Sequence, residues 1–214
     1  MPGVISAGGP ETAVAGATIL QQGGNAVDAA VAAAFASFIA EVGVVHLGGS
    51  GIAHIFDPQN GRSLVYDFFS TTPGLDGRPP ASMDFQAVTI DFGATTQDFH
   101  LGRASVAVSG NIAGLCTLAS NHGRLPLATL LQPAIRLAET GTAIEPFQAD
   151  TCKLLAPLYT HTAGMRQIFA ANGRIIQPGE HLHIPHLADT LRALAAEGAD
   201  YAQHGRLAQA ILAD

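Results

Sequence analysis

The 214-residue chain has no tryptophan, only two cysteines and few charged side chains. Asp, Glu, Lys and Arg make up 13% of it, and acidic residues outnumber basic ones by 17 to 10, so its formal net charge is −7. Proteins that bind polyanions concentrate Lys and Arg on one surface, and this sequence contains no run of basic residues. We therefore expect no nucleic-acid partner.

Long hydrophobic runs are also missing. The most apolar segment, residues 26–40, is shorter than the roughly 20 residues that a helix needs to cross a bilayer. The first residues, Met1-Pro2-Gly3-Val4, have neither the basic nor the apolar region of a secretory signal. These features predict a soluble protein without a membrane partner, cytoplasmic in the absence of a signal peptide. A truncated N-terminus would leave a periplasmic or secreted location open.

Redox or metal centres have little sequence support. Cys116 and Cys152 show no C-x-x-C spacing, which favours two buried thiols. His181 and His183 alternate as strand neighbours and His186 follows, but no carboxylate or cysteine lies nearby in the sequence to complete a site. We expect no metal ion and no cofactor.

What the chain does have is a segment of small apolar residues between two groups of glycines. Asn25 is placed to cap a helix over residues 26–40, and Asp28 can complete a capping-box-like pair with it. Because this helix is apolar on every side, we expect protein all around it. The glycines at 48, 49 and 51 precede a strand, whereas phosphate-binding loops lead from a strand into a helix. A tight backbone turn is the favoured interpretation and a phosphate cradle the alternative.

Residues 1–110 are expected to combine strands with core helices. The predicted elements are a strand at 4–7, a helix from Pro10 with Ala13, Ala17 and Leu20 facing inward, and a strand pair at 51–56 and 62–68 joined as a hairpin. Residues 75–100 are predicted to be irregular, because they are rich in Gly, Pro, Asp and Thr, and another strand is expected at 104–108.

Residues 111–214 are expected to be helical. The predicted helices cover 127–131, 133–140, 148–158, a short segment ending near 171, 187–197, and 201 to the end at Asp214. The last helix has an apolar face, Leu207, Ala210 and Ile211, with nothing after it to cover it. The fold class is therefore α+β, with a helix-rich C-terminal half.

Five segments resemble one family. The stretch from Gly23 to Ala33, GGNAVDAAVAA, resembles the signature of the γ-glutamyltranspeptidase (glutathione hydrolase) family. Residues 105–114 are similar to its V-P-G-x-x-x-G stretch, with Ser109 in place of Pro. Residues 122–126 (HGRLP), 131–138 (LQPAIRLA) and 205–211 (GRLAQAI) resemble further motifs of the family in the same order. The resemblance also continues through the glycine turn and the hairpin, and further matches in the same order extend it from residue 4 to 214.

The resemblance implies part of an N-terminal-nucleophile hydrolase with an αββα sandwich. Proteins of that family cleave themselves into a large and a small subunit, and the new N-terminal Thr of the small subunit attacks the amide substrate. This chain resembles only the first part of the large subunit, as a single partial domain over residues 1–214. The catalytic Thr is thus expected outside the chain, in a small-subunit partner from the same precursor. The Thr95-Thr96 pair is an unfavoured alternative for an internal processing site, because the sequence expected after the nucleophile is missing.

One departure from the family concerns the substrate. The large subunit normally provides an Arg, in a D-G-R-E-(T/M)-A-P stretch, that pairs with the substrate's α-carboxylate. Here Phe69 occupies that position, followed by Ser70 and Thr71, and these three are the predicted substrate-binding residues. An apolar ring cannot make the charge-assisted pair that a carboxylate needs. The D-F-F stretch, together with residues 91–100, resembles a distinct branch of the family in which γ-glutamyl substrates are expected to bind poorly.

Two functions remain open from the sequence. One is the large-subunit part of an amide hydrolase or acyltransferase that acts on a small amide or γ-glutamyl-like substrate and is inactive as this chain alone. The other is a non-catalytic remnant or scaffold of the same fold whose surfaces bind a partner. A small subunit with an N-terminal Thr would favour the first, and its absence the second.

Overall fold

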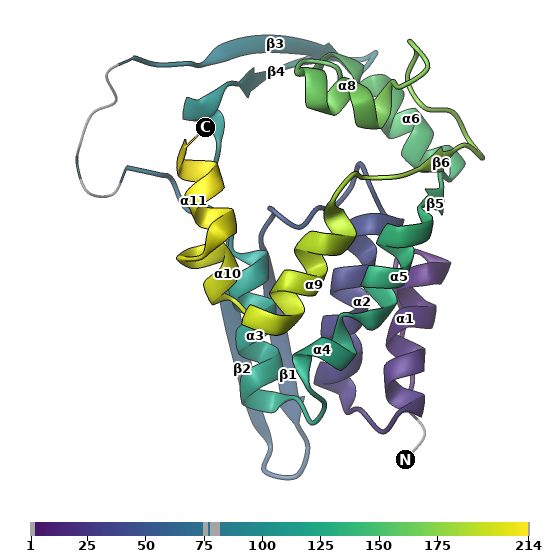
Figure 1. The fold of residues 1–214 in the computed structure, drawn as a ribbon, viewed down its shortest axis with the longest axis vertical. Helices are drawn as coiled ribbons and strands as arrows, with labels where there is room; N and C mark the ends of the chain where they lie inside the picture. The colour runs from purple at the N-terminus through teal and green to yellow at the C-terminus, as the bar shows by residue number, and fades with distance from the viewer. Residues whose placement is uncertain (1–2, 75–76, 78–81, 214) are drawn as a thin grey trace. The chain divides into compact units, whose positions relative to one another are not determined.

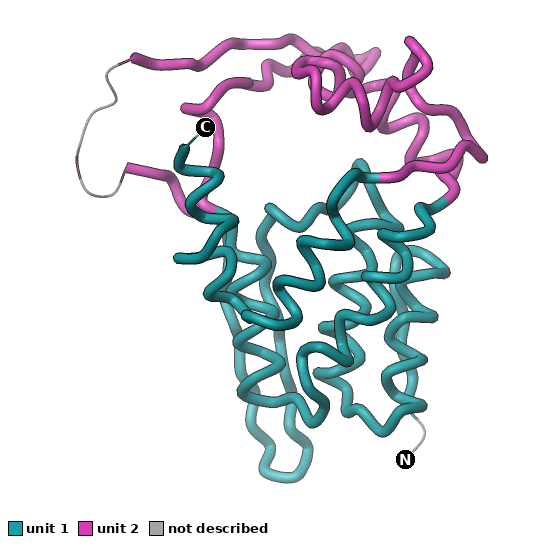
Figure 2. The backbone as a smooth tube through the Cα atoms, in the orientation of Figure 1, with its two compact units in different colours: residues 1–69, 109–142, 184–214 teal, residues 70–108, 143–183 magenta. Residues whose placement is uncertain are grey.

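The computed structural model describes residues 3–74, 77 and 82–213, and its backbone is mixed α and β (Figure 1). The chain divides into two compact units (Figure 2). Unit 1 contains residues 1–69, 109–142 and 184–214, and unit 2 contains residues 70–108 and 143–183. The helices and strands confirm the predicted α+β class. The organisation as a single partial domain stays a prediction.

Unit 1 contains one hairpin and most of the helices. Its strands are β1 (Gly51–Asp57) and β2 (Arg62–Phe68). Its helices are α1 (Pro10–Gln21), α2 (Ala26–Ala40), α3 (Asn111–His122), α4 (Leu127–Leu130), α5 (Gln132–Thr140), α9 (Leu187–Glu197), α10 (Asp200–Gln203) and α11 (Arg206–Ala213).

Unit 2 is built from shorter elements. It contains β3 (Gln86–Asp91), β4 (Thr96–Leu101), a 3₁₀ turn (Arg103–Ser105), α6 (Pro146–Leu154), α7 (Ala156–Tyr159), α8 (Ala163–Phe169) and β6 (His181–Leu182). The short strand β5 (Thr142–Ala143) lies where the chain passes from unit 1 into unit 2 and pairs with β6.

Helix α2 begins and ends where the sequence predicted. The Asn25 side chain accepts the Asp28 N–H, and the Asp28 carboxylate accepts the Asn25 N–H, which completes the capping box. The helix packs against α1 and α5, and its buried side chains join the main hydrophobic cluster. Burial on every side is wrong, however, because Ala26 and Ala30 are exposed.

The inner face of α1 differs from the prediction. The buried residues are Thr12, Ala15, Gly16 and Ile19, not Ala13, Ala17 and Leu20. Thr12 can face the core because its hydroxyl donates to the Glu41 carboxylate at 2.6 Å. At Gly16 a Cβ would meet the Ile5 side chain and the Ala29 carbonyl, so the helices approach closely there.

The β1–β2 hairpin is confirmed, in a continuous antiparallel register from Gly51 opposite Phe68 to Asp57 opposite Arg62. Alternate residues point to opposite faces of a strand. One face therefore presents Ala53, Ile55, Tyr66 and Phe68 to the helices, and these side chains pack on the hydrophobic cluster.

The irregular segment predicted at 75–100 is wrong in its second half, where β3 and β4 form an antiparallel hairpin; residues 75, 76 and 78–81 lie outside the described chain. Val88 lies opposite Phe99 in the register, and Ile90, two residues along on the same face, is buried. This apolar alternation was concealed in the sequence by the Asp and Thr residues of the other face.

Two predicted strands do not form. Residues 4–7 have no strand partner in the described chain, and Val4 is 98% exposed. In the segment 104–108, the amide groups of Ala104 to Val106 are used in tight turns and in a bond to the Asp84 carbonyl. Only Val108 pairs in strand fashion, as an isolated bridge with Thr71.

Two predicted helices are each divided in two. The helix expected at 148–158 becomes α6 and α7, which meet at Leu155, because Pro157 has no N–H to donate to the preceding turn. The C-terminal helix expected from residue 201 becomes α10 and α11, separated by His204 and Gly205. On α11, Leu207 is half-buried but Ala210 and Ile211 are exposed, as the sequence predicted.

None of the helices over the described residues is both long enough and apolar enough to span a bilayer.

Candidate functional site

The predicted substrate-binding residues follow the C-terminal end of β2. The Phe69 ring is 63% exposed, and its backbone N–H donates to Asp67 Oδ1 at 2.9 Å, which turns the chain as it leaves the strand. Ser70 and Thr71 already belong to unit 2, where the N–H of Thr71 and that of Val108 each donate to the other's carbonyl, at 3.3 and 2.9 Å. Their role in substrate binding stays a prediction.

The end of β2 is held in place by α3. At Gly114 a Cβ would collide with the Phe68 ring, and at Gly110 it would collide with the Phe68 carbonyl. A close approach of this kind is open only to glycine. The glycines of the 105–114 motif thus have a structural explanation: they let α3 pack directly beneath the residue that precedes Phe69.

The glycine turn before β1 belongs to the same junction. The Gly49 N–H donates to the His46 carbonyl at 3.0 Å, which confirms the predicted tight turn. The Gly49 carbonyl accepts the N–H groups of Gly110 and Asn111, both at 3.1 Å, and the Asn111 side chain donates to the His46 carbonyl at 3.0 Å. The backbone N–H groups at the start of α3 thus bond to the turn itself. The turn therefore fixes the backbone geometry at this junction. Sequence reasoning missed Asn111.

A second junction is centred on Asp28, whose side chain is fully buried. Besides its bond within the capping box, the carboxylate accepts the backbone N–H of Arg124 with both oxygens at 3.0 Å and that of Leu125 at 3.4 Å. The Asn25 side chain donates to the His122 carbonyl at 2.6 Å. The first and third family motifs therefore bind each other across the core, a link that spacing alone could not reveal.

Next to this junction, the Tyr66 hydroxyl lies 2.6 Å from His122 Nε2, and the two rings meet edge to face. Asn121 donates to the same hydroxyl at 3.4 Å. The pair ties β2 to the C-terminal end of α3 on the helix side of the hairpin.

Both cysteines are free thiols, as predicted, although only Cys152 is fully buried and Cys116 is half-buried. Burial raises the pKa of the Cys116 thiol to about 11 and also raises the pKa of Cys152. Since the thiolate is the reactive form, this burial disfavours nucleophilic reactivity of both thiols.

Within residues 3–74, 77 and 82–213, no three His, Cys, Asp or Glu side chains lie close enough together to hold a metal ion. His181, His183 and His186 form no such group.

An apolar groove of about 540 Å³ runs along β1 in unit 1. It is lined by β1 from Gly51 to Phe56, by one stripe of α2, and by Leu115 and Leu118 of α3. The α2 stripe comprises Ala26 and Ala30, which are exposed, and Val27, Ala34 and Ser37, which are half-buried. β1 pairs with β2 on one side only within the described residues, so the groove adjoins the open edge of a two-stranded sheet.

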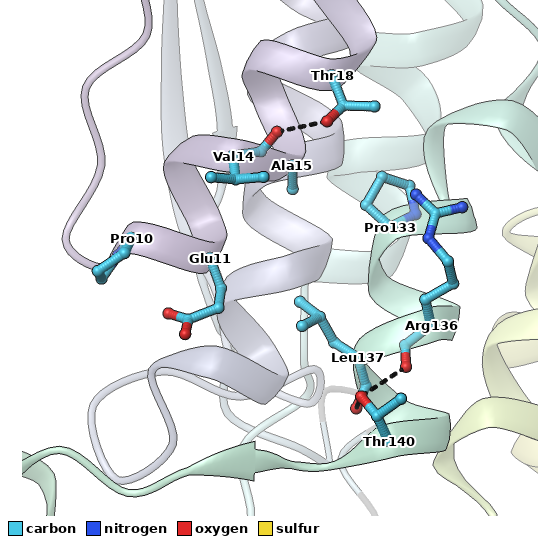
Figure 3. A pocket seen from close by; sticks show the side chains of 9 residues that line it. All are labelled: Pro10, Glu11, Val14, Ala15, Thr18, Pro133, Arg136, Leu137 and Thr140. Carbon is cyan, nitrogen blue, oxygen red and sulfur yellow. Dashed lines mark hydrogen bonds between the residues drawn. The ribbon is translucent and has the colours of Figure 1, made fainter.

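A smaller pocket of about 300 Å³ lies between α1 and α5 (Figure 3). Ala15, Pro133 and Leu137 provide its apolar lining. Glu11 and Arg136 stand on opposite walls, but Figure 3 shows their charged ends directed away from each other. The side chains do not converge on one ligand.

Comparison with known proteins identifies the family and the fold of the chain. The model of the γ-glutamyltranspeptidase family matches residues 12–214. The chain belongs to this family. Its fold is accordingly that of part of an N-terminal-nucleophile hydrolase, in a family of hydrolases and acyltransferases.

Three similar proteins illustrate the range of the family. The chain is 36% identical to the acylase ACY 1 proenzyme of Pseudomonas sp. (strain SE83), over 98% of this chain and 37% of that protein. It is 29% identical to glutathione hydrolase 3 of Arabidopsis thaliana, over 99% and 32% respectively. The γ-glutamyltranspeptidase structure from Helicobacter pylori superposes with a TM-score of 0.81 at 28% identity, over 98% of this chain and 58% of that one.

The chain thus spans about a third of the length of the curated relatives it matches.

Proposed function

We propose that this chain is the large-subunit framework of an amide hydrolase or acyltransferase whose nucleophilic Thr is supplied by a small subunit from the same precursor. The observation that carries the proposal is the family match over residues 12–214, combined with a relative named as a proenzyme. In this proposal the chain alone has no turnover, and it contributes the end of β2 to a substrate site completed by its partner.

The substrate proposed is an amide whose acyl group lacks the α-carboxylate of a γ-glutamyl group. Phe69 occupies the position of the family's carboxylate-binding Arg, and its exposed ring offers only apolar contact. The chain is also more similar to a relative named acylase, at 36% identity, than to one named glutathione hydrolase, at 29%. Both observations support the branch with D-F-F in place of D-G-R.

The groove beside β1 supports the proposed partner. An unpaired strand edge above an apolar helix is a surface that proteins usually cover, because it otherwise templates aggregation. An added strand would cover the α2 stripe and continue the sheet. We propose that the partner provides that strand, in agreement with relatives nearly three times the length of this chain.

The first experiment is intact-mass spectrometry of the protein purified from its natural source under native conditions. A co-purifying chain with an N-terminal Thr is the expected result. A native preparation that contains neither such a chain nor hydrolase activity would contradict the proposal and favour the non-catalytic scaffold.

The second experiment compares two anilides with that preparation. They are γ-glutamyl anilide and γ-aminobutyryl anilide, which differ only in the α-carboxylate. We expect the native protein to prefer the γ-aminobutyryl compound. Phe69→Arg should shift the kcat/KM ratio toward the γ-glutamyl compound by about 10- to 100-fold, as expected for one charge-assisted pair. Phe147→Arg serves as the control, because Phe147 is a similarly exposed Phe on α6 that lines neither the groove nor the predicted substrate site.

Hydrolysis of both anilides with an unchanged ratio in Phe69→Arg would disprove the substrate assignment while leaving the hydrolase proposal intact.

A further inference from the structure

The turn that joins β1 to β2 contains an Asn-Gly pair, Asn60-Gly61, whose side-chain amide is exposed. Two of the five asparagines in the chain precede glycine, Asn60 and Asn172, and both are exposed. Asn-Gly sequences are the ones in which the following backbone nitrogen attacks the side-chain amide most readily, because glycine has no Cβ to hinder the approach.

The structure distinguishes the two sites. The Gly173 N–H donates to the Ala170 carbonyl at 2.9 Å, so its nitrogen is engaged in a hydrogen bond. The Gly61 N–H makes no hydrogen bond with any described residue, and Gly61 is held at a φ of 65° at the tip of the hairpin. The backbone nitrogen that would attack is thus available at Gly61 and hydrogen-bonded at Gly173.

The surroundings of Asn60 also favour the reaction. The Arg62 N–H donates to Asn60 Oδ1 at 2.9 Å, where it withdraws electron density from the carbonyl carbon under attack and stabilises the oxyanion that forms. Asn60 Nδ2 donates to Asp57 Oδ2 at 2.7 Å, a contact that holds the side chain in the turn but does not itself activate the amide. Asn172 has no side-chain hydrogen bond to any described residue.

We propose that Asn60 is a site of spontaneous deamidation and that Asn172 is protected in the folded protein. The Gly61 nitrogen, after losing its proton to solvent base, forms a bond to Asn60 Cγ. The Cγ–Nδ2 bond breaks, ammonia leaves with a proton from water, and a succinimide remains. Water then opens either carbonyl of the ring to give aspartate or isoaspartate, adding one negative charge at the tip of the hairpin.

The test is peptide mapping by mass spectrometry after prolonged incubation of the folded chain at mildly alkaline pH. Conversion at Asn60 is expected to be several-fold to about tenfold faster than at Asn172. This is the factor expected because the Gly173 nitrogen must first lose its one hydrogen bond. In urea, where both sites are unfolded, the two rates should become similar. Asn25, Asn111 and Asn121, which do not precede glycine, serve as internal controls.

Equal rates in the folded protein, or faster conversion at Asn172, would overturn the proposal. Gly61→Ala should slow conversion at residue 60, and circular dichroism checks that this variant is folded. If this variant is not folded, the comparison of Asn60 with Asn172 in the unmodified chain still tests the proposal.

Discussion

Asp28 shows how one side chain of the alanine-rich segment connects distant parts of the chain. Its carboxylate is fully buried and accepts backbone N–H groups from Asn25, Arg124 and Leu125. A buried carboxylate is tolerated only when such donors replace the water it has lost. The charge serves folding here, because every one of these donors is a backbone amide that would otherwise be unsatisfied.

Asp28→Asn is expected to lower the free energy of unfolding by about 2–4 kcal/mol, because an amide group would turn N–H donors toward backbone N–H donors. Urea denaturation followed by circular dichroism measures the change. Asp150→Asn is the matched control, since Asp150 is exposed and makes no side-chain hydrogen bond with the described residues, and it should change stability by no more than about 0.5 kcal/mol. Similar losses in both variants would argue against a special role for Asp28.

At the scale of elements, the contact between α3 and the end of β2 positions the candidate site. The helix can approach the strand because Gly110 and Gly114 have no side chains where Phe68 passes. Phe69 follows immediately, so any shift of α3 away from the strand would move the predicted substrate-binding residue.

Gly114→Ala should therefore destabilise unit 1 by about 1–3 kcal/mol, because the new Cβ would overlap the Phe68 ring in a packed core. Gly164→Ala provides the control. Gly164 also lies in a helix, α8, but a Cβ there meets nothing within 4 Å, so helix propensity should leave that variant unchanged or up to about 1 kcal/mol more stable. The denaturation midpoint should fall in Gly114→Ala and should stay the same or rise in Gly164→Ala. A loss of stability in both would contradict the steric explanation.

The elements also show what the sequence could and could not predict. α2, the β1–β2 hairpin and α9 were predictable because caps, a turn sequence and a terminal glycine mark their ends locally. The β3–β4 hairpin and the inner face of α1 were not, because they depend on tertiary partners. Thr12 can be buried because Glu41, at the end of α2, accepts its hydroxyl. For the candidate site, the end of β2 was predictable, but Asn111 and the contacts of Asp28 were not.

At the scale of the whole molecule, the two units differ in how much apolar surface each one buries. Unit 1 contains the main hydrophobic cluster, built from α1–α5 and α9, with the hairpin packed against it. The buried apolar residues of unit 2 are few and scattered: Ile90, Ile144, Ala149, Cys152, Phe169, Ile176 and Leu182. Because local stability follows the density of buried contacts, the units should not open equally often.

Hydrogen exchange followed by mass spectrometry should detect this difference. The slowest amides are expected in α2, whose residues Val31 to Ala33 are buried within the cluster, and the fastest structured amides in β3 and β4. A two-stranded hairpin with one apolar face gains little independent stability, so its amides should exchange through local opening while α2 exchanges only when unit 1 unfolds. Low concentrations of urea should then accelerate exchange in α2 but leave β3 and β4 almost unchanged. Equal protection in both regions, with the same urea dependence, would instead mean that the two units unfold as one.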